Sequence, residues 1–130
     1  MTYEKNAVYS YLREKILTEF PTAYVTGKFV PKPPSFPAVY IHEIDRFRPL
    51  QNIQLDYSDV QWESVMEVRV VSVLDSTAMS EAYNVMRVAE AGFNDLYYRE
   101  FSETNIDGGD IFTLIGRFRR VIGGGDIMKT

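Results

Sequence analysis

The 130-residue chain contains no cysteine and only one histidine. The missing cysteines exclude a thiol nucleophile, a disulfide framework and a zinc–thiolate site. Because there is only one histidine, metal sites that need two or more histidine ligands are excluded as well. The longest apolar run, 38–41, is far shorter than the roughly 20 residues that span a bilayer. The N-terminus also lacks the basic-then-apolar order of a signal peptide. We therefore expect a protein that is made inside the cell and has no membrane partner.

The chain also lacks an excess of positive charge. Fourteen Lys and Arg stand against eighteen Asp and Glu, which gives a net charge of −4 at pH 7. Residues 1–60 hold seven of each sign, so the acidic excess lies in residues 61–130. Because nucleic-acid-binding surfaces are normally basic, this balance argues against non-specific binding to DNA or RNA. With 45% hydrophobic residues, the composition is typical of one globular domain that needs no crosslink.

Hydrophobic periodicity predicts two helices. Apolar residues spaced four apart predict the first over about 3–19, and Pro21 ends it because the residue before a proline disfavours the helical conformation. The second is predicted over about 75–97, with capping residues at Asp75-Ser76. Its buried stripe is expected to consist of Ala82, Met86, Ala89 and Phe93.

Alternating hydrophobicity and turn residues predict five strands, over about 22–26, 36–44, 62–75, 98–106 and 111–122. The last two are joined by Asp107-Gly108-Gly109-Asp110, whose glycines allow the positive backbone angles of a tight hairpin. All six prolines lie between 21 and 49, and those in 30–35 predict an extended spacer. Residues 45–61 follow neither period, which predicts a long loop or a projecting hairpin rich in apolar side chains.

The order helix, strand, strand, strand, helix, strand, strand has too few β-α-β units for a doubly wound parallel sheet. We predict an α+β fold with two helices on one face of a mainly antiparallel sheet of four to five strands. Residues 1–122 would form the domain, and 123–130, which begin with three glycines, a flexible tail. The opposite sheet face is expected to carry Tyr40, His42, Glu67, Arg69, Arg117 and Arg119.

No residue pattern predicts catalysis. His42 is followed by Glu43, but neighbours on a strand point to opposite faces, so a structural or surface role is expected for this histidine. Asp107 and Asp110 suit a turn better than a calcium site, which needs six to eight oxygen ligands. The glycines at 123–125 lack the Lys-Ser/Thr that follows them in a phosphate loop. We expect neither an enzyme nor a cofactor or metal site.

Two clusters point towards protein contacts instead. The long connection concentrates apolar area that a monomer has either to pack internally or to present to a partner. Arg117 and Arg119 share a strand face, where they suit ion pairs with Glu67 and other acidic groups across an interface, or, alternatively, phosphate contacts. The predicted interface consists of Phe47, Arg48, Leu50, Ile53, Leu55, Tyr57, Trp62, Glu67, Arg69, Arg117 and Arg119.

This layout resembles the small tail-terminator, or tail-completion, proteins of long-tailed bacteriophages and related prophage particles. The resemblance rests on 36–43 as the second strand, on 65–74 followed by the helix start at Asp75-Ser76, and on 116–122 as the final strand. It extends over about residues 3–122 and lies mainly in the order and length of the elements.

The resemblance implies an α+β subunit that forms a hexameric ring on the head-proximal end of the tail tube. There it would stop tube polymerisation and present a surface to the head connector, while DNA passes through the ring without specific binding. The implied partners are other copies of the chain, the tail tube protein and the head–tail connector. No catalysis is implied, and the protein would reside in the virion after synthesis in the host cytoplasm.

Two other functions stay open. A head-completion (neck) protein of the same particle would share the size and the ring, and binding to the connector instead of the tube would identify it. A small enzyme or ligand-binding α+β domain would require a concave pocket with convergent polar groups, which no residue spacing here predicts.

Overall fold

The structure is a computed structural model that describes residues 5–28, 30–47, 61–73, 78–108 and 110–123. Its elements follow the predicted order and are α1 (Lys5–Glu19), β1 (Tyr24–Thr26), β2 (Ala38–Phe47), β3 (Gln61–Val73), α2 (Ala78–Asp95), β4 (Arg99–Gly108) and β5 (Ile111–Gly123). The prediction of an α+β fold is therefore confirmed. The expected helix start at Asp75-Ser76 and the tail beyond 123 lie outside the described residues.

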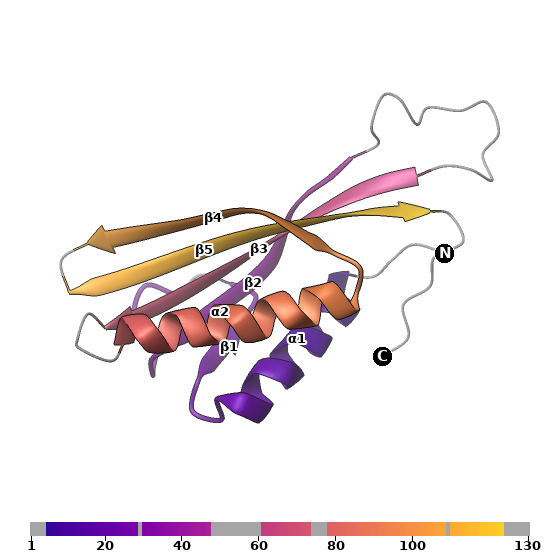
Figure 1. Cartoon of the computed structure of the whole chain (residues 1–130). Coiled ribbons are helices and arrows are strands. Elements are labelled where there is room, and N and C mark those ends of the chain that lie inside the picture. The colour runs from indigo at the N-terminus through magenta and orange to yellow at the C-terminus, as the bar shows by residue number, and fades with distance from the viewer. Residues whose placement is uncertain (1–4, 29, 48–60, 74–77, 109, 124–130) are drawn as a thin grey trace.

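The five strands form one mixed sheet in the order β1-β2-β3-β5-β4 (Figure 1). The short β1 pairs in parallel with Ala38–Tyr40 of β2, and the other three pairings are antiparallel. The mainly antiparallel sheet was expected, because β3 and β2, like β4 and β5, are neighbours in the chain. Pairing of β3 with β5 across the α2 crossover places distant residues side by side.

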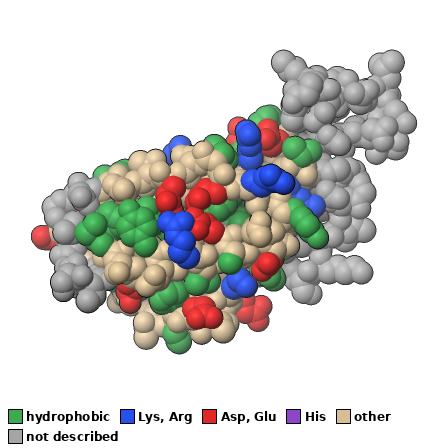
Figure 2. Space-filling model, in the orientation of Figure 1, with side chains coloured by type: hydrophobic (Ala, Val, Ile, Leu, Met, Phe, Trp, Pro, Cys, Tyr) green, Lys and Arg blue, Asp and Glu red, His purple; other side chains and the backbone are tan. Residues whose placement is uncertain are grey.

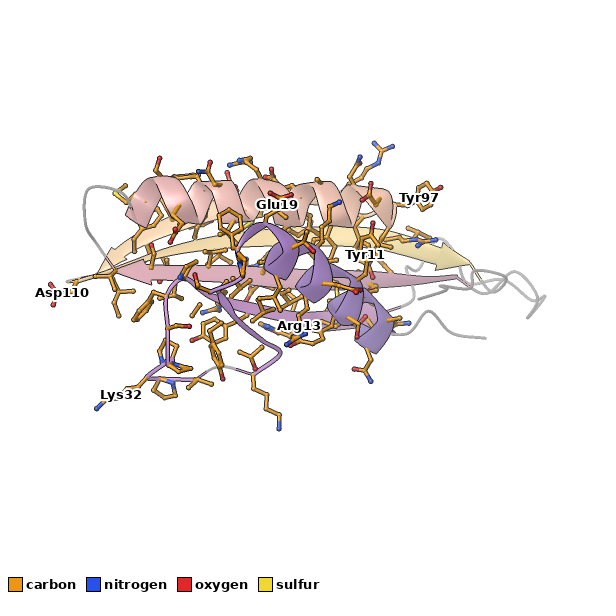
Figure 3. The ribbon with its side chains drawn as sticks, turned by 90° about the horizontal axis from the view of Figure 1, so that it is seen from below. Tyr11, Arg13, Glu19, Lys32, Tyr97 and Asp110 are labelled. Carbon is orange, nitrogen blue, oxygen red and sulfur yellow. The ribbon has the colours of Figure 1, made fainter. Side chains whose placement is uncertain are left out.

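Both helices cover the same face of the sheet (Figures 1 and 3). The core fills the space between them and is built from alternate residues of the three central strands, which is what the period-2 pattern predicts. The buried strand side chains are Val39, Ile41, Met66, Val68, Val70, Phe112, Leu114 and Phe118, and the buried helix side chains include Val8, Leu12, Ile16, Ala82, Met86, Ala89 and Phe93. The predicted stripe of α2 is thus confirmed. Neither helix has the combination of length and apolarity that crossing a bilayer requires, as far as the described residues extend.

The predicted end of the second strand at Ile44 was wrong. Pairing with β3 continues to Phe47, after a β-bulge between Glu43 and Asp45. The bulge inserts one unpaired residue, Ile44, and so shifts the alternation of inward and outward side chains by one position. This shift makes residues 45–47 resemble irregular chain in the sequence, although their backbone remains in the sheet.

Candidate interaction surface on the uncovered sheet face

The sheet face opposite the helices, called the uncovered face below, consists of every second residue of β3 and β5 and their partners on β2 and β4. Its centre is a row of cross-strand partners in which His42 lies opposite Glu67 and Glu67 lies opposite Arg117. Arg69 follows two residues after Glu67 on the same side of β3. The strand register therefore brings one carboxylate and three potential cations together.

These four residues form an ion-paired centre. Arg69 donates from Nε to Glu67 Oε1 at 2.7 Å, and Arg117 donates from Nε to Oε2 at 3.0 Å. The Nε2 atom of His42 lies 3.6 Å from Oε1. The Glu67 side chain is only 3% exposed, whereas both arginine side chains remain 42% exposed. Each guanidinium thus keeps donors that can reach a further acceptor.

Two opposing effects set the pKa of Glu67. Burial alone would raise the pKa, because it disfavours the charged form, but the hydrogen bonds from Arg69 and Arg117 outweigh burial and hold the pKa below its ordinary value. Glu67 is therefore ionised at neutral pH. Two arginines around one carboxylate leave this centre with a net positive charge.

Apolar side chains flank the ion-paired centre at both ends of the uncovered face. At one end Val73 lies opposite Ile111, next to Ile106 of β4. At the other end Phe47 and Val121 both lie opposite Glu63. Six of the exposed large hydrophobic side chains lie on this face: Phe47, Val73, Phe101, Ile106, Ile111 and Val121. An apolar area of this kind beside arginines is typical of a protein–protein interface.

The proline-rich spacer extends the first of these apolar ends. Residues 30–35 contain no helix or strand, as predicted, whereas the strand that was expected from Phe36 begins at Ala38. Val30 is held by a hydrogen bond from the Tyr40 hydroxyl to its carbonyl oxygen at 3.0 Å. A shallow groove runs between the spacer and the sheet, and it is lined by Val30, Pro31, Lys32, Pro33, Phe36, Tyr40, Val71, Ile111 and Thr113. Figure 3 shows the spacer, marked by Lys32, standing away from the helices. The groove adds a recess to an otherwise open apolar area.

The structure brings five of the predicted interface residues to the uncovered face: Phe47, Glu67, Arg69, Arg117 and Arg119. Outside the described residues lie Arg48, Leu50, Ile53, Leu55, Tyr57 and the side chain of Trp62. Because Glu67 already pairs within its own chain, an ion pair of these arginines across an interface would need a different carboxylate. That part of the hypothesis stays a prediction.

Most residues of the apolar flanks lie outside the interface predicted from the sequence. Strand alternation places Val73, Ile111 and Val121 on the same side as the polar residues of their strands. Phe101 gives no such signal, because a second β-bulge, between Glu100 and Ser102, changes the alternation of β4.

A second polar cluster lies on the helix side of the sheet, between α2 and β4 (Figure 2). The carboxylates of Glu90, Glu100 and Glu103 come within 4.8 Å of one another. Arg87 pairs with Glu90 and donates to Glu103 at 3.0 Å. Burial, followed by a hydrogen bond with Glu90, raises the pKa of Glu100 to about 7. These oxygens could ligate a cation, but Arg87 already pairs with two of the three carboxylates.

The side chains of His42 and Glu43 lie on opposite faces of the sheet. Glu43 points to the helix side, where it accepts hydrogen bonds from Arg46 and, at 2.6 Å, from the Ser64 hydroxyl. Ser64 in turn accepts from the Tyr98 hydroxyl at 3.0 Å. The expected separation of His42 from Glu43 is confirmed, and the fully buried Ser64 is out of reach of a substrate.

Comparison with models of protein families finds no match to the chain, and comparison with curated proteins finds none either.

Proposed function

We propose that this protein is a tail-terminator protein of a long-tailed phage or a related prophage particle. In this proposal six copies form a ring that caps the head-proximal end of the tail tube and joins it to the head connector. The observation that carries the proposal is the uncovered face, on which exposed apolar side chains flank an ion-paired centre. A monomer gains nothing from this exposed apolar area, whereas a protein that works by contact with other subunits requires it.

The uncovered face suits contact between identical subunits. A ring forms when one surface of a subunit binds a different surface of the next and the rotation closes. The apolar flanks supply area to bury, and the half-exposed Arg69 and Arg117 fix the register by donating to carboxylates of the neighbour. Glu67 keeps both arginines extended over the sheet before contact, which reduces the side-chain entropy lost on assembly.

The remaining features agree with this role. The order of elements over 5–123 is the one that the resemblance implies. The net charge of −4 favours free passage of DNA through a ring over its retention.

The test measures the mass of the purified protein alone and mixed with the tube protein and, separately, with the connector protein of the same particle. Mass photometry is expected to find assemblies near six times 15.0 kDa, and negative-stain images are expected to show caps that limit tube length. A strict monomer that neither binds nor caps tubes would contradict the proposal. Binding to the connector without binding to the tube would identify a neck protein instead.

A pair of variants tests whether the uncovered face makes these contacts. Ile111→Asp places a charge in the apolar flank and is expected to abolish ring formation and capping. Met79→Asp is the matched control, because Met79 is similarly exposed but lies at the start of α2. Equal losses in the two variants would show that the uncovered face is not the contact surface.

A further inference from the structure

Arg99 and Arg119 form a like-charge pair on the uncovered face. They are direct cross-strand partners on β4 and β5, so their side chains leave the sheet on the same side. Like charges in this arrangement destabilise a sheet. Arg99 makes no hydrogen bond or ion pair with any residue that the structure describes. Arg119 pairs with Glu63, whose Oε1 lies 3.8 Å from the Arg119 Nε.

An exposed aromatic ring lies beside this pair. The bulge between Glu100 and Ser102 turns Phe101 towards the uncovered face, where it is 48% exposed. The guanidinium of Arg119 lies 5.4 Å from the centre of its ring. β-bulges commonly re-aim a side chain at a functional site. We call Arg99, Phe101 and Arg119 the arginine corner.

The residues just before the arginine corner contain a second exposed aromatic ring in contact with an arginine. Tyr97 has a backbone φ of 65°, a left-handed conformation that is strained for a tyrosine, and its side chain is 77% exposed. Figure 3 shows Tyr97 at the end of α2, directed away from the body of the protein. Arg120 lies 5.5 Å from the centre of the tyrosine ring and donates to the Leu96 carbonyl oxygen at 2.9 Å. Figure 2 shows basic side chains gathered over this end of the molecule.

The local charge is opposite to that of the whole chain. The nearby acidic cluster of Glu90, Glu100 and Glu103 lies on the opposite side of β4 from the arginine corner, where Arg87 pairs with Glu90 and Glu103. The repulsion between Arg99 and Arg119 lowers the stability of the free protein, and a bound anionic group would offset it.

Apolar side chains beside the arginine corner favour a protein segment as the source of the anionic group. Val121 follows Arg119 on the same side of β5, and Phe47 lies across the sheet from Val121, on the far side of Glu63. Affinity for a DNA duplex comes mainly from Lys and Arg contacts to many phosphates, whereas this corner offers two arginines and the chain as a whole is acidic. We propose that the arginine corner binds a segment of a partner protein in which carboxylates flank an apolar side chain. This inference does not depend on ring formation.

The first experiment uses Arg99→Glu, which places a carboxylate opposite Arg119. If the like-charge pair serves binding and not folding, the melting temperature of the variant rises by about 1–4 °C, because a cross-strand ion pair replaces a repulsion. Arg13→Glu, an equal charge change at an exposed position of α1, is the control and is expected to leave the melting temperature unchanged. A lower melting temperature for Arg99→Glu would assign Arg99 a structural role and overturn the proposal.

The second experiment measures binding of the full chain to three probes by fluorescence anisotropy. The probes are a short peptide of alternating aspartate and leucine, the same peptide with asparagine, and oligothymidylate. The aspartate peptide is expected to bind more tightly than the other two, and Arg99→Glu or Arg119→Gln is expected to weaken it by about tenfold, unlike Arg13→Glu. Equal binding of the asparagine peptide, tighter binding of oligothymidylate, or no binding would each overturn the proposal while leaving the ring-assembly test unaffected.

Discussion

At the scale of the residue, Glu67 combines near-complete burial with an ionised side chain on the uncovered face. Burying a carboxylate is costly unless its charge is matched and its oxygens are hydrogen-bonded. Arg69 and Arg117 provide both, one to each oxygen. Because the arginines are half exposed, they can return to water when the carboxylate is removed, which limits the cost of losing it.

We expect Glu67→Gln to lower the free energy of unfolding by about 1–3 kcal/mol at neutral pH, because two charge-assisted hydrogen bonds are weakened. The lowered pKa means that the unfolded chain binds the proton more tightly, so this stability is present above 4.5 and is lost as the pH falls through the folded-state pKa. Urea unfolding at several pH values measures both effects. Glu63→Gln is the control, since its longer contact with Arg119 is expected to contribute less than about 0.5 kcal/mol.

Glu100 is expected to show the opposite pH dependence. Its pKa of about 7 lies above the ordinary value of 4.5, so the folded protein holds the proton more tightly and loses stability as the pH rises between these values. Glu100→Gln removes this pH-dependent loss of stability. Above pH 7 its free energy of unfolding is expected to exceed that of the natural chain by about 1 kcal/mol, after allowance for solvent screening. Near pH 4.5 no gain is expected. Melting temperatures across this range test the prediction, and a gain that does not vary with pH would contradict it.

At the scale of the element, Gly92 allows the two helices to approach closely. A Cβ atom at this position would lie 2.8 Å from Leu12 Cδ1 and 3.1 Å from Lys15 Cδ of α1. The contact is extended by the Tyr11 hydroxyl, which donates to Asp95 at 2.9 Å, and by Lys15, which pairs with the same carboxylate at 3.4 Å. The small residue therefore determines the spacing of the helical layer.

Gly92→Val is expected to lower the free energy of unfolding by about 1–3 kcal/mol, because the buried Leu12 has no space to move into. Ala91→Val introduces the same β-branched residue one position earlier, where the side chain is exposed, and controls for helix propensity. Denaturant unfolding of both variants is the measurement. A loss in the control as large as that in Gly92→Val would exclude helix–helix overpacking as the cause.

At the scale of the whole molecule, both helices pack on one face of the sheet, and in our proposal the other face makes the contacts between subunits. In our proposal the exposed apolar flanks supply the area that is buried on assembly, so ring formation is expected to resist salt. Raising the salt concentration from about 0.1 M to about 1 M shortens the screening length from about 10 Å to about 3 Å, and we expect the ring affinity to fall by less than about tenfold. Complete dissociation, detected by light scattering, would show that ion pairs hold the ring.

The fold could be predicted in outline from the sequence, and the errors of that prediction have a common cause. The two helices and five strands follow from the 3.6 and 2.0 periods, and the stripe through Ala82 and Phe93 was located correctly because helix geometry fixes it. The end of β2 was misplaced because it follows the β-bulge between Glu43 and Asp45. Phe101 was not predicted on the uncovered face because it occupies the β-bulge between Glu100 and Ser102. A bulge depends on the pairing strand and leaves no local sequence pattern.

The sequence by itself determined the kind and order of the elements, the side of each regular strand that is buried, and the absence of cysteine chemistry, because these depend on composition and short-range periodicity. Only the tertiary structure decided which distant residues meet. Glu67 meets Arg117, and Arg99 meets Arg119, because β5 lies between β3 and β4 in one particular register. Strand order and register are determined by packing of the whole core under the two helices, and no local segment encodes them.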